Sequence, residues 1–154
     1  MNQNVKDLIG WLKLYGERET NSFTRFFFFY MCFDAWITAE SQKDRDTEKL
    51  KWFLSNDNCL KDEWFEVLPS KRMTSLLNDL KTKSPVYDDS PNSNKKRELN
   101  NINNIEEVVW FIYQIRCNLF HGSKSPMTSR HASLVELSGL ILEKWIAWAV
   151  LKCF

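Results

Sequence analysis

Apolar residues recur every three or four positions along most of this chain, a spacing that places them on one face of an α-helix. Residues 5–17 show this spacing in a short amphipathic segment. A second helix is expected to run to about Ser41 from Asn21 or Ser22, either of which can cap it. Its widest apolar stripe consists of Phe23, Phe26, Phe27, Tyr30, Phe33 and Ile37. Because its other faces also carry aromatic residues, this helix is expected at the centre of a bundle or at a subunit interface.

The same period predicts further helices in the rest of the chain. They are expected over Thr47–Leu54, over Asp62–Leu68, from a cap at Ser70 through Leu80, from a cap at Asn104 through Leu119, and over about Ser129–Cys153. No run long enough for a β-strand alternates apolar and polar residues. The chain has only four Gly and four Pro, which are few turn-forming residues for a many-stranded fold. The predicted fold class is all-α: an up-and-down helical bundle of four to five main helices with short extra helices.

A chain of 154 residues predicts one domain, over residues 1–154, that is long enough to bury a core. The segment from about 82 to 104 differs from the helices in composition. It holds Pro85, Pro91, repeated Asn and Ser, and the basic run Lys95–Arg97. We expect a long loop there, and loops of this length in compact domains are often functional.

The charge of the chain is small but unevenly distributed. The formal net charge is +1, which disfavours a broad basic groove for nucleic acid. From Val108 to Val135, however, the chain has no acidic residue while it carries Arg116, Lys124 and Arg130. This compact positive region fits a local anionic ligand better than a long charged track.

Composition also sets expectations about compartment and cofactors. No two cysteines form a C-x-x-C pair, so we expect reduced thiols at Cys32, Cys59, Cys117 and Cys153. The N-terminus lacks the pattern of a secretory signal, and the apolar stretch 23–36 is too short and too polar for a membrane span, so a cytoplasmic protein without a membrane partner is expected.

Neither a metal nor another cofactor is expected, because the two histidines lack suitably spaced cysteines and no glycine-rich phosphate loop is present. We expect His131 at the surface.

Arg116 and His121 form the candidate catalytic pair. Arginine carries a fixed charge that suits phosphate oxygens, and histidine can move protons near neutral pH. Five positions on a regular helix separate two side chains by about 140° and roughly 7.5 Å along the axis, so Arg116 and His121 would point apart on such a helix. Three features can each bring them together: a last turn loosened at Gly122, the long arginine stem, or a symmetric pairing of two chains. The plainer interpretation is a snorkelling arginine and a histidine that interacts with the helix dipole.

The stretch Ile112–Gly122, which reads IYQIRCNLFHG, resembles the R-x4-6-H element of the HEPN superfamily. Residues 26–37, which read FFFFYMCFDAWI, resemble the aromatic second helix of many members. The resemblance implies a small helical bundle, usually dimeric, and a metal-independent endoribonuclease of the kind found in toxin–antitoxin and antiphage systems. It further implies that Arg116 and His121 of two protomers build one cleft. The partners expected on this basis are an RNA substrate, a second copy in a homodimer, and an antitoxin protein.

Three further residues are supporting candidates. Cys117 follows the motif arginine where the family commonly has a polar residue, and we expect Asn118 to supply that contact instead. Asp34 is a carboxylate on an apolar helix and therefore needs a cationic partner, either a site arginine or another basic residue. Lys124 is a candidate RNA contact or a solvated loop residue.

Two other functions fit the same residues. One is a non-catalytic HEPN-like module that binds RNA or a partner protein through the same positive region. The other is a dimerisation domain with an aromatic interface and no affinity for RNA.

Overall fold

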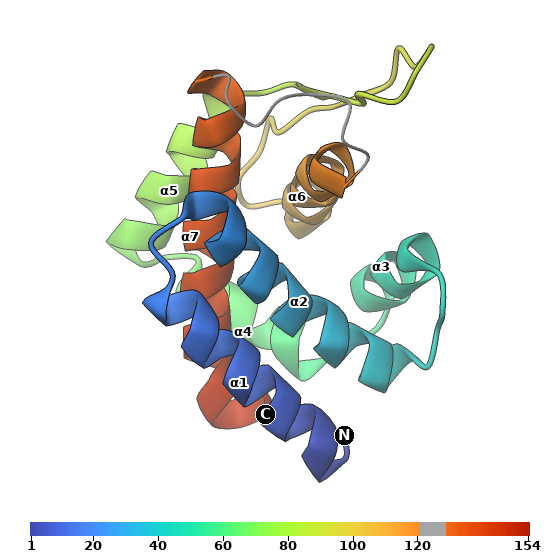
Figure 1. The fold of residues 1–154 in the computed structure, drawn as a ribbon, viewed down its shortest axis with the longest axis vertical. Coiled ribbons are helices and arrows are strands. Elements are labelled where there is room, and N and C mark those ends of the chain that lie inside the picture. Colours follow the sequence, from blue (N-terminus) through green and yellow to red (C-terminus); the bar gives the residue numbers. More distant parts are fainter. Residues whose placement is uncertain (121–128) are drawn as a thin grey trace.

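The structure is a computed structural model of the 154-residue chain, and it describes residues 1–120 and 129–154. Over these residues the fold is all-α apart from one small ribbon, which confirms the predicted fold class. The helices are α1 (Gln3–Arg18), α2 (Ser22–Ser41), α3 (Asp46–Ser55), α4 (Cys59–Val67), α5 (Lys71–Lys81), α6 (Ile105–Phe120) and α7 (Ser129–Cys153), and the strands are β1 (Val86–Tyr87) and β2 (Lys96–Arg97). Figure 1 shows α7 along the longest axis, with α5 beside it and with α1 and α2 crossing it as an adjacent pair.

The expected capping residues start the helices. The side-chain oxygen of Asn21 accepts hydrogen bonds from the amides of Phe23 at 3.0 Å and Thr24 at 3.2 Å. Ser70 and Asn104 make the equivalent contacts at the starts of α5 and α6. These bonds satisfy amides that a helix leaves without partners in its first turn, so local sequence sets where the helices begin.

The aromatic helix α2 lies at the centre of the molecule, as the sequence predicts. It contacts α1 on one side, α7 on another and α3 near its end. Its buried residues are Phe26, Phe29, Tyr30, Cys32, Phe33, Trp36, Ile37 and Ser41. Buried residues from all seven helices join it in one hydrophobic core.

Two glycines allow the neighbouring helices to approach α2 closely. A Cβ at Gly16 of α1 would lie 2.8 Å from the ring of Phe29 and 3.2 Å from the Cβ of Phe28. A Cβ at Gly139 of α7 would lie 3.3 Å from the Cα of Phe26. The absent side chains therefore let the backbones of α1 and α7 pack directly against α2.

The segment expected as a long loop contains the antiparallel ribbon. Its register pairs Val86 with Arg97 and Tyr87 with Lys96. Side chains from two helices bind the backbone of this segment: Asn118 donates to the carbonyl of Tyr87 in β1 at 2.7 Å, and Arg130 donates to the carbonyl of Lys83, which precedes β1, at 2.9 Å. Strands of two residues are too short to produce an alternating pattern, which is why sequence analysis did not detect them.

The expectation of four reduced cysteines is wrong. Cys59 and Cys153 form a disulfide with a Cα–Cα distance of 5.7 Å and a sequence separation of 94 residues. Only Cys32 and Cys117 are free thiols. Packing of α4 against α7 brings the first residue of one helix to the last residue of the other, and no local spacing signals such a contact. The start of α4 also differs from the prediction. Asn58 caps this helix, which therefore begins at Cys59 rather than at Asp62.

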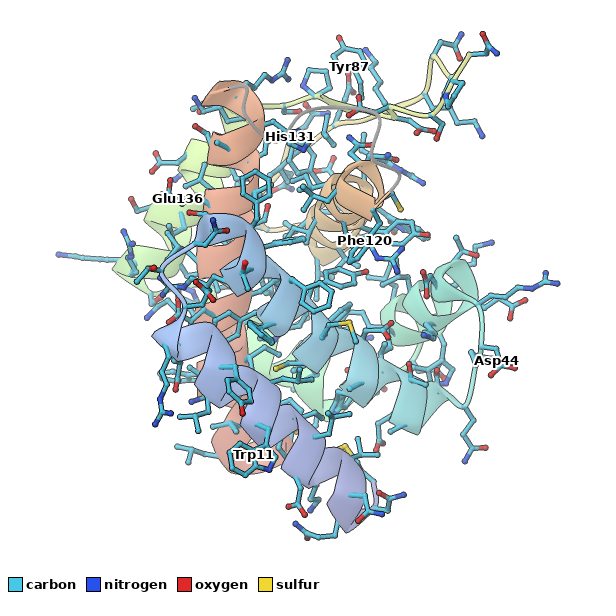
Figure 2. The ribbon with its side chains drawn as sticks, viewed as in Figure 1. Trp11, Asp44, Tyr87, Phe120, His131 and Glu136 are labelled. Carbon is cyan, nitrogen blue, oxygen red and sulfur yellow. A yellow bond between two sulfur atoms is a disulfide. The ribbon has the colours of Figure 1, made fainter. Side chains whose placement is uncertain are left out.

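His131 is buried rather than exposed, with 6% of its surface accessible. It lies in the first turns of α7 and lines a cavity together with Tyr87 and Leu134. Figure 2 shows it beneath the ribbon segment. The amphipathic pattern of α7 could not reveal this, because Val86 and Tyr87, which line the same cavity, come from a distant part of the chain.

Among the residues that the structure describes, no helix combines the length and apolar character that crossing a membrane requires. The long helices α2 and α7 are interrupted by charged and polar side chains, including Arg25, Asp34, Glu136 and Glu143.

Replacing both Cys59 and Cys153 with serine should lower the free energy of unfolding by about 2–4 kcal/mol, because the bond closes a long loop in the unfolded chain. Urea unfolding with and without a reductant measures the loss. The wild-type midpoint should fall to that of the double variant on reduction, and the variant itself should not respond. Equal wild-type midpoints in both conditions would contradict the assignment of the disulfide.

Candidate functional site

The candidate site is carried by the C-terminal half of α6. This helix buries Val108, Ile112 and Ile115, which fix it against the core. Arg116 and Asn118 follow on other faces, and two positions on a helix point about 200° apart. The two polar residues therefore meet different parts of the molecule.

Arg116 contacts one carboxylate and two aromatic rings. Its Nη1 lies 3.1 Å from Oδ2 of Asp46, at the start of α3. Its Cζ lies 4.8 Å from the ring centroid of Phe120 and 5.8 Å from that of Tyr30. The side chain keeps 26% of its surface accessible. A planar guanidinium suits both contacts, because it binds carboxylates through its edge and stacks on rings through its face.

Asp46 continues into a chain of alternating charges. Lys49 Nζ lies 3.5 Å from Asp46 and 3.1 Å from Asp34 of α2. Lys49 is buried, with 7% of its surface accessible, while the two carboxylates are partly exposed. Two cations and two anions thus alternate from α6 through α3 to α2, and their formal charges cancel.

The protonation states of the site follow from this environment. Burial raises the pKa of the Tyr30 hydroxyl well above its usual value, although the charge of Arg116 opposes the shift. Burial also acts to lower the pKa of Arg116, but interactions with Tyr30 and Asp46 outweigh it and raise that pKa. Arg116 is therefore a permanent cation that lies beside a neutral phenol.

Asp34 is connected to Arg116 indirectly, through a series of ion pairs, whereas Asn118 contacts a different part of the molecule. Asp34 pairs with another base, Lys49, and reaches Arg116 only through Lys49 and Asp46. The side chain of Asn118 is buried and faces the ribbon. It donates to the carbonyl of Tyr87 and accepts from the amide of Asp89 at 3.1 Å and from Gln114 at 2.9 Å. The bonds to Tyr87 and Asp89 hold the ribbon on α6, and a catalytic contribution from Asn118 stays a prediction.

His121, Gly122 and Lys124 lie outside the described residues. The described helix α6 ends at Phe120, directly before the motif histidine. The relative placement of Arg116 and His121 therefore stays a prediction from the sequence, as does the contact of Lys124 with RNA.

Sequence reasoning did not identify Asp46 or Lys49 as part of the site. Acidic and basic residues three positions apart at the start of a helix are a common surface pattern, and nothing in it indicates a partner on α6. Tyr30 was visible only as one member of the apolar stripe of α2. The acid-free stretch around Arg116 was the available signal, since it shows that its partner must come from elsewhere in the chain.

The described residues include no cluster of three or more His, Cys, Asp or Glu side chains that could hold a metal ion.

Comparison of the chain with protein-family models, with curated proteins and with solved structures gave no match.

Replacing Lys49 with methionine should destabilise the fold by about 1–3 kcal/mol, because it leaves two neighbouring carboxylates without their shared cation. The loss should stay below that of a fully buried ion pair, since both carboxylates are partly exposed. Urea unfolding of the purified variant measures it.

Lys96→Met is the matched control. Lys96 pairs with Glu98 at 3.2 Å, but about half of each side chain is exposed, at 50% and 49%. Its loss should leave the urea midpoint almost unchanged, because ion pairs between exposed side chains contribute little to stability. If both variants unfold at the same urea concentration, the alternating charges do not stabilise the site.

Proposed function

We propose that this protein is a metal-independent endoribonuclease of the HEPN type, acting as a toxin or as an antiphage effector. The observation that carries the proposal is the placement of Arg116. It is a permanent, partly exposed cation at the end of α6, and it lies within the segment that resembles the R-x4-6-H element.

The chemistry assigned to the pair follows from its residue types. His121 takes the proton of a ribose 2′-hydroxyl, whose oxygen then attacks the adjacent phosphorus. Arg116 stabilises the negative charge that grows on the non-bridging oxygens. DNA lacks the internal nucleophile, so RNA is the proposed substrate. No cofactor is part of this scheme.

Asp46 defines the resting state of Arg116. A phosphate must replace this carboxylate, or share the guanidinium with it, when RNA binds. An ion pair with partly exposed members contributes only about 0–1 kcal/mol, so a phosphate can displace it at small cost. The Nε of Arg116 is buried and has no hydrogen-bond partner among the described residues, so a ligand oxygen that accepts from it would satisfy it.

The proposal includes a homodimer as the working unit, an antitoxin protein as its regulator and the cytoplasm as its location. A two-fold axis would bring two copies of the pair to one cleft and so resolve the divergence of Arg116 and His121 on a regular helix. The Cys59–Cys153 disulfide weighs against the cytoplasm, because such bonds are rare in reducing compartments.

A non-catalytic module that binds RNA or a partner protein is the second candidate. Two observations favour it: Asp46 neutralises Arg116, and Cys117 stands where the family commonly has a polar residue. Such a module binds its ligand and releases no product, and His121→Ala should then have almost no effect. A dimerisation domain predicts no affinity for RNA at all.

Incubation with single-stranded and structured RNA in the presence of a chelator tests the proposal. Arg116→Ala and His121→Ala should each slow cleavage by about 100-fold or more, because each removes a group that acts in the transition state. Arg116→Lys should fall between them and the wild type, since it keeps the charge but loses the planar fork. Gel analysis of the products gives the rates.

Arg97→Ala is the matched control for Arg116→Ala. Arg97 also stacks on an aromatic ring, with its Cζ 4.7 Å from the centroid of Trp110, but it belongs to the ribbon. Its loss should leave the rate unchanged. Cleavage that survives both Arg116→Ala and His121→Ala, in variants whose circular dichroism is native, would refute the site assignment.

A further inference from the structure

Five aromatic side chains form a continuous series of ring contacts that ends at Arg116. Trp11 and Tyr15 of α1 have ring centroids 6.2 Å apart, and Tyr15 lies 5.8 Å from Phe28 of α2. Phe28 lies 5.9 Å from Phe27, and Phe27 lies 5.8 Å from Phe120 of α6. We call these five residues the aromatic ladder. Figure 2 labels its two ends, Trp11 on α1 and Phe120 at the end of α6.

The ladder lies at the surface. Trp11 exposes 59% of its surface, Tyr15 51% and Phe120 51%, while Phe27 exposes 38%. An exposed aromatic residue is common by itself, but a connected set across three helices is not explained by folding, which would bury these rings. The guanidinium of Arg116 stacks on Phe120 and so adds a cation to the last ring.

Close packing of α1 on α2 fixes the ladder in place. Gly16 lets the α1 backbone approach the ring of Phe29 and the Cβ of Phe28, and Tyr15 lies beside Phe28. The rings thus belong to three rigid helices rather than to loops. A ligand that stacks on them meets a surface that is already formed.

The cations around Arg116 are largely neutralised, and this limits how much ionic contacts can contribute to binding RNA there. Arg116 and Lys49 are balanced by Asp46 and Asp34, and the whole chain carries a net charge of only +1. Two cations on the helices of the ladder are paired as well, Lys13 with Glu17 and Arg25 with Glu143. RNA held at this site must therefore gain most of its affinity from contacts other than phosphate pairs. Stacking of bases on aromatic rings is the established alternative, and it tolerates any base sequence.

We propose that the aromatic ladder is the binding track for single-stranded RNA, with bases stacked on Trp11, Tyr15 and Phe120 and a backbone phosphate at Arg116. The inference rests on the proposed function, which it deepens by restricting the substrate to unpaired RNA. Bases in a duplex are already stacked on one another and cannot use the rings. Continuity with Arg116, to which the proposed function assigns a substrate phosphate, favours RNA as the occupant of the ladder.

Fluorescence anisotropy with a labelled 2′-O-methyl RNA of about 12 unpaired nucleotides tests the track, since this probe has no free 2′-hydroxyl and cannot be cleaved through it. Trp11→Ala should weaken binding by roughly tenfold, and Trp11→Ala with Tyr15→Ala by roughly a hundredfold. Trp11→Phe should restore most of the affinity. Raising the salt from about 50 to about 200 mM should weaken wild-type binding only about threefold, as expected for one phosphate contact.

Trp148→Ala is the matched control, because Trp148 exposes 47% of its surface on α7 and has no ring contact with the ladder. It should bind like the wild type. Equal affinities of the wild type and the double variant would overturn the track. So would a solution mass that falls from dimer to monomer in Trp11→Ala, which would make the ladder a contact between copies.

Cleavage of a matching unmodified RNA separates this inference from the proposed function. Binding that depends on the ladder, without cleavage by the wild type, supports the track and refutes the nuclease. Cleavage that depends on Arg116 and His121 but not on Trp11 supports the nuclease and refutes the track.

Discussion

The burial of α2 is the constraint on which the rest of the structure depends. A helix with apolar residues on almost every face must bury most of them, so other helices pack around it. The neighbours meet this demand in different ways. Helices α1 and α7 approach through Gly16 and Gly139, while α3 contributes Phe53, whose ring centroid lies 5.4 Å from that of Phe33.

Trp145 of α7 shows how this packing joins distant parts of the chain. Its ring centroid lies 5.4 Å from that of Phe33 on α2 and 4.9 Å from that of Trp64 on α4. Its indole nitrogen donates to the carbonyl of Leu60 at 2.8 Å, so the polar atom of a buried ring is satisfied. The same contact of α4 with α7 brings Cys59 to Cys153.

Local features of the sequence were sufficient to predict most of the fold. Asn21, Ser70 and Asn104 mark helix starts through bonds that reach only two or three residues, so a single sequence reveals them. The disulfide, the burial of His131 and the ribbon were not predictable in this way. Each depends on a contact with another helix or strand, and the spacing of residues along the chain does not predict such contacts.

The candidate site divides along the same line. Arg116 can be singled out from the sequence, because it lies in an acid-free stretch and its segment resembles a known motif, while its catalytic role stays a prediction. Asp46 and Lys49 cannot, because they approach Arg116 only after α3 has packed near α6. Their presence changes the chemistry from that of an isolated cation to that of a neutral cluster. A ligand for this site must then be recognised by shape and stacking as well as by charge.

The last turns of α6 are held from three directions. Arg116 binds Asp46 of α3, Asn118 binds the backbone of the ribbon, and Phe120 contacts Phe27 of α2. Folding has therefore already removed most of the rotational freedom of these side chains. A molecule that docks here does not have to order them, so the entropy lost on binding is mainly its own.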